Sequence, residues 1–317
     1  MSPVTAPRTD APSASPAGAR VSAGWVSRWT HSQPALALLF LLPSLVVLGG
    51  IVVYPFLSAI WISFQDKYVG AEGRFIGLKN YAQLFTDPVF WRVAQNSLVY
   101  TGAAVAIKIT LGLGMALILN QPRRLNPVFR TILFVPWAVP LIVAALNWRW
   151  IYDDFSGMLN NVLLELGLVH DVISWLSDPD LAMASVVAVV VWCGTPFYTM
   201  SFLAGLQAIP REQYEAARID GASVLQEFRH VTIPHLRNVF TIVVMLSSIF
   251  TSTNLVIVYI LTNGGPANKT QIFPNFAFNV ALAGGRLGYG SAINLAFFPL
   301  LAILIFFLSR RMLRRGE

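Results

Sequence analysis

Residues 209–223 read IPREQYEAARIDGAS, and the polar stretch that they open continues to residue 238 through FRHVTIP at 228–234. Its residues are mostly charged, polar and helix-forming. Apolar segments long enough to cross a bilayer lie on both sides of it, whereas the other connections on its side of the membrane are short. A long polar segment in this position predicts a structured element at the membrane surface.

Two short helices are predicted inside this stretch. Pro210 suits a helix start because its missing N–H is not needed there, and the two glutamates that follow suit the positive end of the helix dipole. Gly221 is placed to end this helix in a left-handed conformation. A second helix is predicted from about residue 224, and Pro234 is predicted to halt it. Together the two helices would form a docking knob that projects from the membrane.

The composition places most of the chain in lipid. Of 317 residues, 56% are hydrophobic and only 12% are charged, and the mean hydropathy is +0.62. A soluble domain carries about 25% charged residues, so this chain has about half the charge that a water-facing surface needs. The net charge is +7, but the basic residues form no stripe interleaved with aromatic ones, so no nucleic-acid partner is expected.

Six stretches are apolar over the roughly 20 residues that a helix needs to cross a bilayer. Lipid offers no water to the backbone, and no alternating pattern typical of a barrel occurs, so each stretch is predicted to be a helix. The sequence thus predicts an all-α membrane protein, surrounded by membrane lipid, with six transmembrane helices at 35–64, 97–119, 129–152, 181–206, 239–261 and 290–308.

Residues 1–33 are predicted to form a disordered cytoplasmic N-terminal tail, which leaves 34–317 as the membrane domain. The tail is rich in Pro, Ala, Ser and Thr and cannot bury enough apolar surface to fold. A secretory signal peptide is the competing interpretation. However, the apolar run that follows is long enough to span a bilayer, and no clear cleavage site follows it.

The distribution of basic residues predicts the orientation. With the N-terminus inside, the inner segments hold fourteen Lys and Arg residues and the outer loops hold six. Because cytoplasmic loops carry the excess of positive charge, both termini and the 209–238 stretch are predicted to be cytoplasmic.

Three short motifs in the 209–238 stretch resemble a known family. They are Glu215-Ala216-Ala217, then Asp220-Gly221-Ala222, then Ile233-Pro234. This pattern is similar to the cytoplasmic signature loop of ABC importer permeases, in which a short coupling helix sits in a cleft of the ATPase subunit. The resemblance implies a type I ABC importer transmembrane domain in a bacterial cytoplasmic (inner) membrane. It also implies that five residues couple to the ATPase: Glu215, Ala216, Ala217, Asp220 and Gly221.

Two outer motifs resemble the carbohydrate-transporting branch of this family. FIGLKNY at 75–81 is similar to its first outer loop, and LTNGGP at 261–266 is similar to an outer loop of the maltose-transport permease subunit. The resemblance implies that Gly264, Gly265 and Pro266 contact an extracytoplasmic solute-binding protein. It further implies a second homologous permease subunit and a dimer of ABC ATPase subunits as partners.

The fifth predicted span carries a polar face. Four of its residues follow one another at i, i+3, i+4 and i+7, on one side of a helix: Ser247, Phe250, Thr251 and Asn254. Polar groups in lipid need partners, so this face either bonds to neighbouring helices or lines a water-filled cavity. By resemblance, the maltose permease carries sugar-contacting residues on this helix, and the match extends to Gly194 and Phe197 in the fourth span. The resemblance implies a sugar, oligosaccharide or related polyol as substrate.

Lys108 lies in the middle of the second predicted span. An intramembrane charge is a functional hypothesis by default, but no acidic partner lies within the predicted spans. We expect this lysine to snorkel or to pair at a subunit interface. An ion-coupled secondary transporter is the alternative class of protein, and it would show paired ionisable groups at mid-membrane and an internal repeat. The sequence shows one isolated lysine and no repeat.

No catalytic or metal site is expected in this chain. It contains no GxxxxGK[ST] phosphate loop, so ATP and Mg²⁺ would bind to the partner ATPase, and this subunit would bind no cofactor of its own. The four histidines are scattered without ligand spacing, and the chain has a single cysteine. The chain is predicted to be a transport subunit rather than an enzyme.

Overall fold

The computed structural model describes residues 33–313 with the exception of Arg123 and Leu125. The tail predicted for residues 1–33 therefore lies outside the described residues, apart from Gln33. The described residues are mostly helical, and their one sheet has two strands of two residues each. The predicted all-α membrane fold is confirmed.

The chain divides into two units, residues 1–57 and 58–317. The first predicted span is helical over three consecutive segments: α2, Gln33–Leu48; the π-helical η1, Gly49–Val53; and α3, Tyr54–Ser63. No residue in the most apolar window of Leu36–Ser63 is buried. A helix that is apolar on all sides and uncovered suits lipid, so this span agrees with its prediction.

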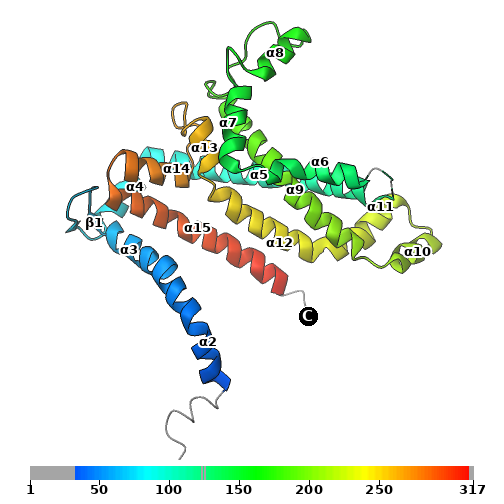
Figure 1. Ribbon diagram of the computed structural model, residues 1–317, viewed down its shortest axis with the longest axis horizontal. Helices are drawn as coiled ribbons and strands as arrows, with labels where there is room; N and C mark the ends of the chain where they lie inside the picture. Colours follow the sequence, from blue (N-terminus) through cyan, green and yellow to red (C-terminus); the bar gives the residue numbers. More distant parts are fainter. Residues whose placement is uncertain (1–32, 123, 125, 314–317) are drawn as a thin grey trace, which may run out of the picture. The chain divides into compact units, whose positions relative to one another are not determined.

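In the second unit, α5 and α9 pack along each other, and α12 contacts both (Figure 1). Their bounds are Pro88–Asn120 for α5, Ala182–Gln207 for α9 and Ile233–Ser252 for α12. The α5 helix begins well before the predicted span at 97–119 because Asp87 caps it. The Asp87 carboxylate accepts a hydrogen bond from the Val89 N–H at 2.8 Å, and Pro88 fills the first position of the helix.

The α5 helix approaches α9 closely at Gly112. A Cβ atom at this position would lie 2.5 Å from the Tyr198 Cβ and 3.2 Å from the Thr199 backbone nitrogen. Gly114, in the same helix, has no heavy atom within 4 Å of its Cβ position. Small residues let helices approach each other in a membrane, and Gly112 allows the close approach of α5 to α9.

The third predicted span, 129–152, is wrong as a single straight helix. It consists of α6, Asn126–Ala138, and α7, Leu141–Ile151, which are bent by 93°. Pro140 lies between them, and a proline lacks an N–H and disfavours helical geometry for the residue before it. The described part of the chain has five helices able to cross a membrane, or six if this pair counts as one span.

The predicted helix stop near Pro234 is also wrong. The helical run continues from α11, Val224–Glu227, through the π-helical η2, Phe228–Thr232, into α12. The Ile233 N–H bonds to the Phe228 carbonyl, five residues back, and Pro234 follows in the first turn of α12. This wider turn accommodates a proline that would clash with the carbonyl of residue i−4 in a regular α-helix.

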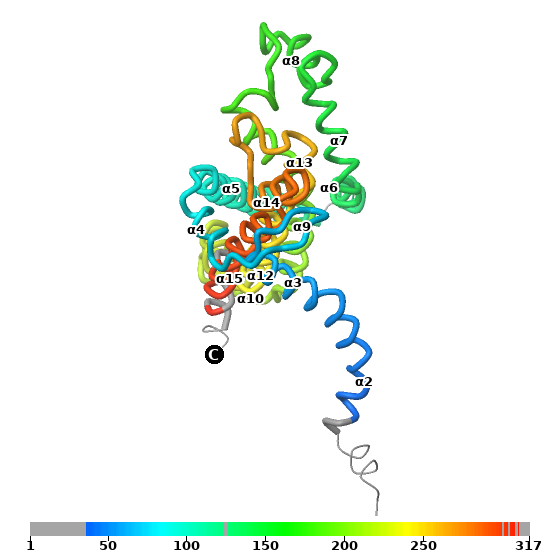
Figure 2. The backbone as a smooth tube through the Cα atoms, turned by 90° about the vertical axis from the view of Figure 1, so that its left-hand side faces the viewer, coloured from blue at the N-terminus to red at the C-terminus, as the bar shows by residue number. Residues whose placement is uncertain are grey.

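Two opposite ends of the helical bundle carry the connecting elements (Figure 1). One end holds α10, Arg211–Ile219, together with α11, the end of α5 and the start of α6. The other end holds α4, Lys79–Thr86, with α13, Val256–Leu261, and α14, Phe273–Phe278. Helix α7 extends away from α5 and α9 and leads to α8, Met158–Glu165, in both views (Figure 2).

Three further elements complete this second end. The strands β1, Gln65–Asp66, and β2, Arg74–Phe75, pair antiparallel, and β1 packs on the last helix, α15, Leu287–Leu313. The π-helical η3, Asn279–Ala283, joins α14 to the turn that precedes α15.

We predict that Gly112→Ala destabilises the fold by about 1–3 kcal/mol, the usual cost of overpacking a core. The matched control is Gly114→Ala, which should be neutral or stabilising by up to about 1 kcal/mol because alanine is the better helix former. Thermal unfolding of both variants in detergent measures the difference. Equal unfolding temperatures for the two variants would contradict this account of the α5–α9 contact.

Candidate functional site

All the residues predicted to contact substrate line one cavity of about 590 Å³ beside α5, α9 and α12. They come from α9 and from the α12 region: Gly194, Phe197, Ser247, Phe250, Thr251 and Asn254. Trp137 and Leu141 also line it, because the bend at Pro140 brings α6 and α7 to the same space. The structure therefore brings the predicted residues together.

The cavity walls combine apolar surface with a few polar groups. Ser247 and Thr251 are buried, whereas Phe250 keeps 67% of its surface exposed. Aromatic and apolar surface with few convergent polar groups is the usual composition of a small-molecule site.

The helix is interrupted at the cavity. Helix α12 ends at Ser252 and α13 begins at Val256, with Asn254 between them. The Asn254 Oδ1 accepts a long hydrogen bond from the Ile257 N–H, with 3.5 Å between the oxygen and the nitrogen. Non-helical backbone at membrane depth is tolerated where it lines a cavity or is buried in protein. The break therefore fits the position of this cavity in the fold.

Lys108 also lines the cavity and does not snorkel, so pairing at a subunit interface stays as the other predicted arrangement. Only 3% of its surface is exposed. Its Nζ donates a hydrogen bond to the Thr251 Oγ1 at 2.8 Å and lies 5.9 Å from the centroid of the Tyr198 ring. Sequence reasoning placed this lysine in a span but missed its place beside Thr251, because no local pattern indicates which helices meet there.

Gly194 makes room for this lysine. A Cβ atom at Gly194 would lie 2.7 Å from the Lys108 Cδ and 3.1 Å from its Nζ. The lysine side chain thus passes directly over α9 at a residue without a side chain. Gly194 lines the cavity, and because it has no side chain it also leaves the space that the lysine occupies.

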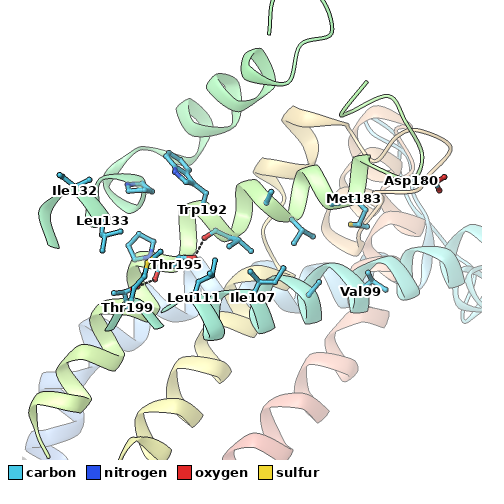
Figure 3. A pocket seen from close by; sticks show the side chains of 18 residues that line it. Val99, Ile107, Leu111, Ile132, Leu133, Asp180, Met183, Trp192, Thr195 and Thr199 are labelled. Carbon is cyan, nitrogen blue, oxygen red and sulfur yellow. Dashed lines mark hydrogen bonds between the residues drawn. The ribbon is translucent and has the colours of Figure 1, made fainter. Parts of the chain in front are cut away.

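A larger cavity of about 880 Å³ lies between α5, α6 and α9 and holds none of the predicted site residues (Figure 3). Its lining is mostly apolar, with Ile107, Leu111 and Trp192 among the labelled side chains. The hydroxyls of Thr195 and Thr199 bond to carbonyls of their own helix. This surface offers few free polar groups to a hydrophilic ligand.

The knob predicted at 209–238 forms at the far end of the bundle. Helix α10 ends as predicted, with Gly221 at a left-handed φ of 78°. The Gly221 N–H bonds to the Arg218 carbonyl, and the Ala222 N–H bonds to the Ala217 carbonyl. These two bonds satisfy the last carbonyls of α10, and a residue with a Cβ would be strained at Gly221.

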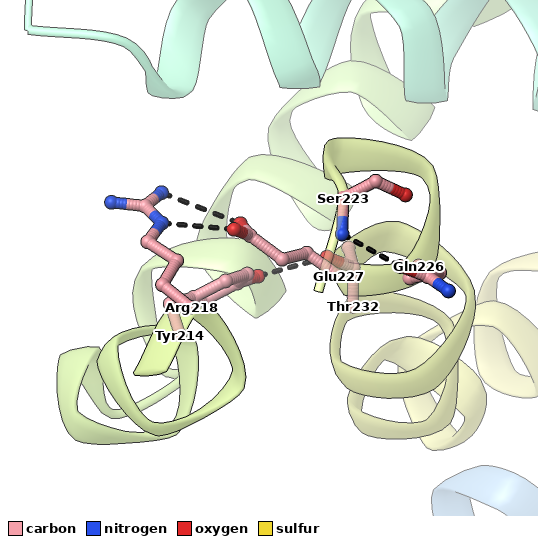
Figure 4. Close-up of polar contacts among 6 residues, drawn as sticks. All are labelled: Tyr214, Arg218, Ser223, Gln226, Glu227 and Thr232. Atoms are coloured by element: carbon pink, nitrogen blue, oxygen red, sulfur yellow. Dashed lines mark hydrogen bonds and ion pairs between the residues drawn. The ribbon is translucent and has the colours of Figure 1, made fainter. Parts of the chain in front are cut away.

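Side-chain bonds hold α10 against α11 and η2 (Figure 4). The Arg218 Nε lies 2.9 Å from one carboxylate oxygen of Glu227, and a second guanidinium nitrogen lies 3.3 Å from the other. This pair raises the pKa of the Arg218 guanidinium above its usual value. The Tyr214 hydroxyl lies 3.0 Å from the Thr232 hydroxyl. We call residues 211–227 the coupling knob.

The coupling knob presents both acidic and apolar groups to solvent. Glu215, Ala216, Asp220 and Gly221 are exposed, whereas Ala217 packs on the core beneath. Three large apolar side chains are also exposed, by 87%, 82% and 74%: Ile219, Val224 and Leu225. Sequence reasoning missed these three. A cluster of exposed apolar residues marks an interaction surface.

The predicted binding-protein loop is compact. Gly264 is buried at a φ of 88°, and a Cβ there would overlap the Gln271 side chain. Gly265 and Pro266 are half-buried. The Thr270 hydroxyl bonds to the Gly265 carbonyl at 2.6 Å and lies 2.7 Å from the Thr262 hydroxyl. In the described residues, no cluster of His, Cys, Asp and Glu is suited to hold a metal ion.

Comparisons with known proteins give the chain relatives over most of its length. The family model described as binding-protein-dependent transport system inner membrane component matches residues 108–316. The trehalose/maltose transport system permease protein MalF of Thermococcus litoralis is 36% identical over 86% of this chain and 92% of its own length. The sulfoquinovosyl glycerol transport system permease protein SmoG of Agrobacterium fabrum is 33% identical over 89% of this chain and 92% of its own length.

A solved structure supports the fold. A chain of a bacterial ABC transporter involved in the import of the acidic polysaccharide alginate has a TM-score of 0.78 to this protein, at 18% identity. The match covers 89% of this chain and 96% of the other. The type I importer transmembrane fold that the sequence predicted is therefore confirmed.

We predict that Glu227→Ala loosens α10, because it removes both bonds that the Arg218 guanidinium makes to α11. Backbone amides of α10 should exchange with deuterium about threefold faster, a small effect because Arg218 is largely exposed to solvent. The control is Gln213→Ala, which removes an exposed and uncharged side chain of the same helix. Exchange that is unchanged in Glu227→Ala, or equally fast in both variants, would contradict the role of this ion pair.

Proposed function

Because this chain belongs to the binding-protein-dependent transport system inner membrane component family, we propose that it carries a sugar, oligosaccharide or related polyol across the membrane. Within that family it is a permease of an ABC importer and not an enzyme. The observation that carries the substrate proposal is that six residues from α9, α12 and the break after α12, chosen from the sequence as sugar contacts, line one cavity.

The chemistry of the cavity supports a sugar. A sugar ring has apolar C–H faces and equatorial hydroxyls, which suit an aromatic face next to hydroxyl and amide groups. Phe250 supplies such a face, and Ser247, Thr251 and Asn254 supply polar groups on the same helix side. Two relatives, named for trehalose/maltose and for sulfoquinovosyl glycerol, carry sugar compounds and support this substrate class.

Three partners complete the proposed importer. A second, homologous permease subunit would close the side of the cavity where Phe250 is exposed. A dimer of ABC ATPase subunits, which would bind ATP and Mg²⁺, would receive the coupling knob. An extracytoplasmic solute-binding protein would deliver substrate near Gly264, Gly265 and Pro266, where the rigid loop presents Asn263, Ala267 and Asn268 to solvent.

The proposed coupling runs along one helix. The helical stretch Val224–Ser252 carries the last part of the coupling knob at its start and most of the polar cavity face near its end. When ATP binding closes the ATPase dimer, a movement of the knob would be passed to Ser247 and Thr251 through this stretch. Packed helices shift between discrete arrangements, so such a movement would open the cavity to the other side of the membrane.

Family membership also gives the location of the chain in the membrane and weighs against an ion-coupled secondary transporter. The chain is an inner membrane component, and we propose that both termini and the coupling knob lie in the cytoplasm, as the basic residues predict. An ion-coupled secondary transporter would need paired ionisable groups within the spans. In the described part of the chain, the ammonium of Lys108 has no carboxylate within 4.0 Å.

We predict that Glu215→Arg abolishes substrate-stimulated ATP hydrolysis and uptake in the assembled importer, because it reverses the charge at the centre of the knob. Insertion and thermal unfolding of the chain should stay as in the wild type, since Glu215 is exposed. The control is Glu165→Arg on α8, the same reversal outside the knob. Uptake and ATP hydrolysis that remain coupled in Glu215→Arg would contradict the docking role.

A further inference from the structure

We propose that the substrate carries an anionic group and that Lys108 selects it. This inference rests on the proposed function and narrows its substrate class to acidic sugars, such as a uronic acid or a sulfonated sugar. Lys108 would hold the carboxylate or sulfonate, while the polar face of α12 holds hydroxyls.

The first step is that Lys108 has no counter-charge within this chain. The residue is buried, with 3% of its surface exposed. An ammonium has three hydrogens to donate, and the described residues accept one of them, at the Thr251 hydroxyl. No Asp or Glu lines the cavity, and among described residues no carboxylate reaches the Lys108 Nζ.

The second step is that the fold makes space for this lysine. Its stem crosses α9 at Gly194, where a Cβ atom would come within 2.7 Å of the lysine Cδ. The Tyr198 ring, one turn further along α9, also lies near the ammonium, with 5.9 Å between Nζ and the ring centroid. The ammonium is thus held at the wall of the cavity, beside a hydroxyl predicted from sequence to contact substrate.

The third step concerns the charge of the ligand. A charged group within a membrane protein is costly unless it is paired and hydrogen-bonded. Among the described residues, the cavity lining has hydroxyls and an amide but no Asp or Glu, so we assign the counter-charge to the ligand. A neutral sugar would leave the ammonium uncompensated, whereas a carboxylate or sulfonate on the sugar would form a charge-assisted hydrogen bond with it.

A carboxylate of the second permease subunit is the other possible source of the counter-charge. In that arrangement Lys108 would hold the two subunits together and would not discriminate between neutral and acidic sugars. The two arrangements therefore differ in substrate selectivity, which can be measured on the assembled importer.

The test uses the purified importer with its binding protein in liposomes supplied with ATP. Three neutral sugars are compared with their C6-carboxylate derivatives: trehalose, maltose and glucosylglycerol. Uptake and stimulated ATP hydrolysis are measured for the wild type and for the variants Lys108→Met and Lys108→Arg. Lys79→Met, which removes an exposed lysine at the start of α4, controls for the change in net charge.

We expect the wild type to prefer at least one acidic derivative over its neutral parent. Lys108→Met should lower the uptake of that derivative about tenfold, because it removes a hydrogen bond to a charged group. Lys108→Arg should retain much of the uptake of the acidic derivative, and Lys79→Met should take it up as the wild type does.

Preference for the neutral sugars, or equal uptake of the acidic derivative by Lys108→Met, would overturn this inference and leave the proposed function intact. If none of the six compounds is taken up or stimulates ATP hydrolysis, the proposed function fails together with the inference. The wild-type comparison needs no variant, so the result stands even if Lys108→Met does not fold.

Discussion

Lipid offers no hydrogen-bond partner to a backbone N–H or C=O group, so a membrane-spanning helix must satisfy these groups itself. The fold depends on this constraint. The chain departs from regular helix where a cavity or a change of direction requires it. The bend at Pro140 brings Trp137 and Leu141 to the cavity wall. The break between α12 and α13 places Asn254 on the same wall. Irregular backbone and the candidate site therefore coincide.

The same constraint joins the cavity to the coupling knob. A π-helical turn at Phe228–Thr232 accommodates Pro234, so the helical run continues from Val224 to Ser252, where the break before α13 begins. Side-chain bonds from Arg218 to Glu227 hold α10 against the start of this run. A displacement at the knob thus acts on the helix that carries the polar cavity face, and this continuity gives the proposed coupling its physical basis.

Much of this could be predicted from local sequence. The helical period placed Ser247 and Thr251 on one face, and a glycine at the end of a predicted helix indicated the left-handed conformation of Gly221. The predictions that failed depend on contacts that a local stretch of sequence does not reveal. Pro234 does not end its helix, because a π-helical turn accommodates it. Lys108 does not snorkel, because Gly194 of α9 leaves space for its aliphatic chain and the Thr251 hydroxyl of α12 accepts a hydrogen bond from its ammonium. The sequence of one helix cannot predict such contacts among three helices.

The central claim is that the coupling knob docks into an ABC ATPase, and site-directed cross-linking tests it most directly. Cys193 is the only cysteine of the chain and is buried, so Ala216→Cys introduces an exposed thiol on the knob. The tagged variant is treated with a short thiol-to-amine cross-linker in native membranes, and the product is identified by mass spectrometry. The account predicts a cross-link to a subunit with a phosphate-binding loop. A product containing only copies of this chain would contradict it.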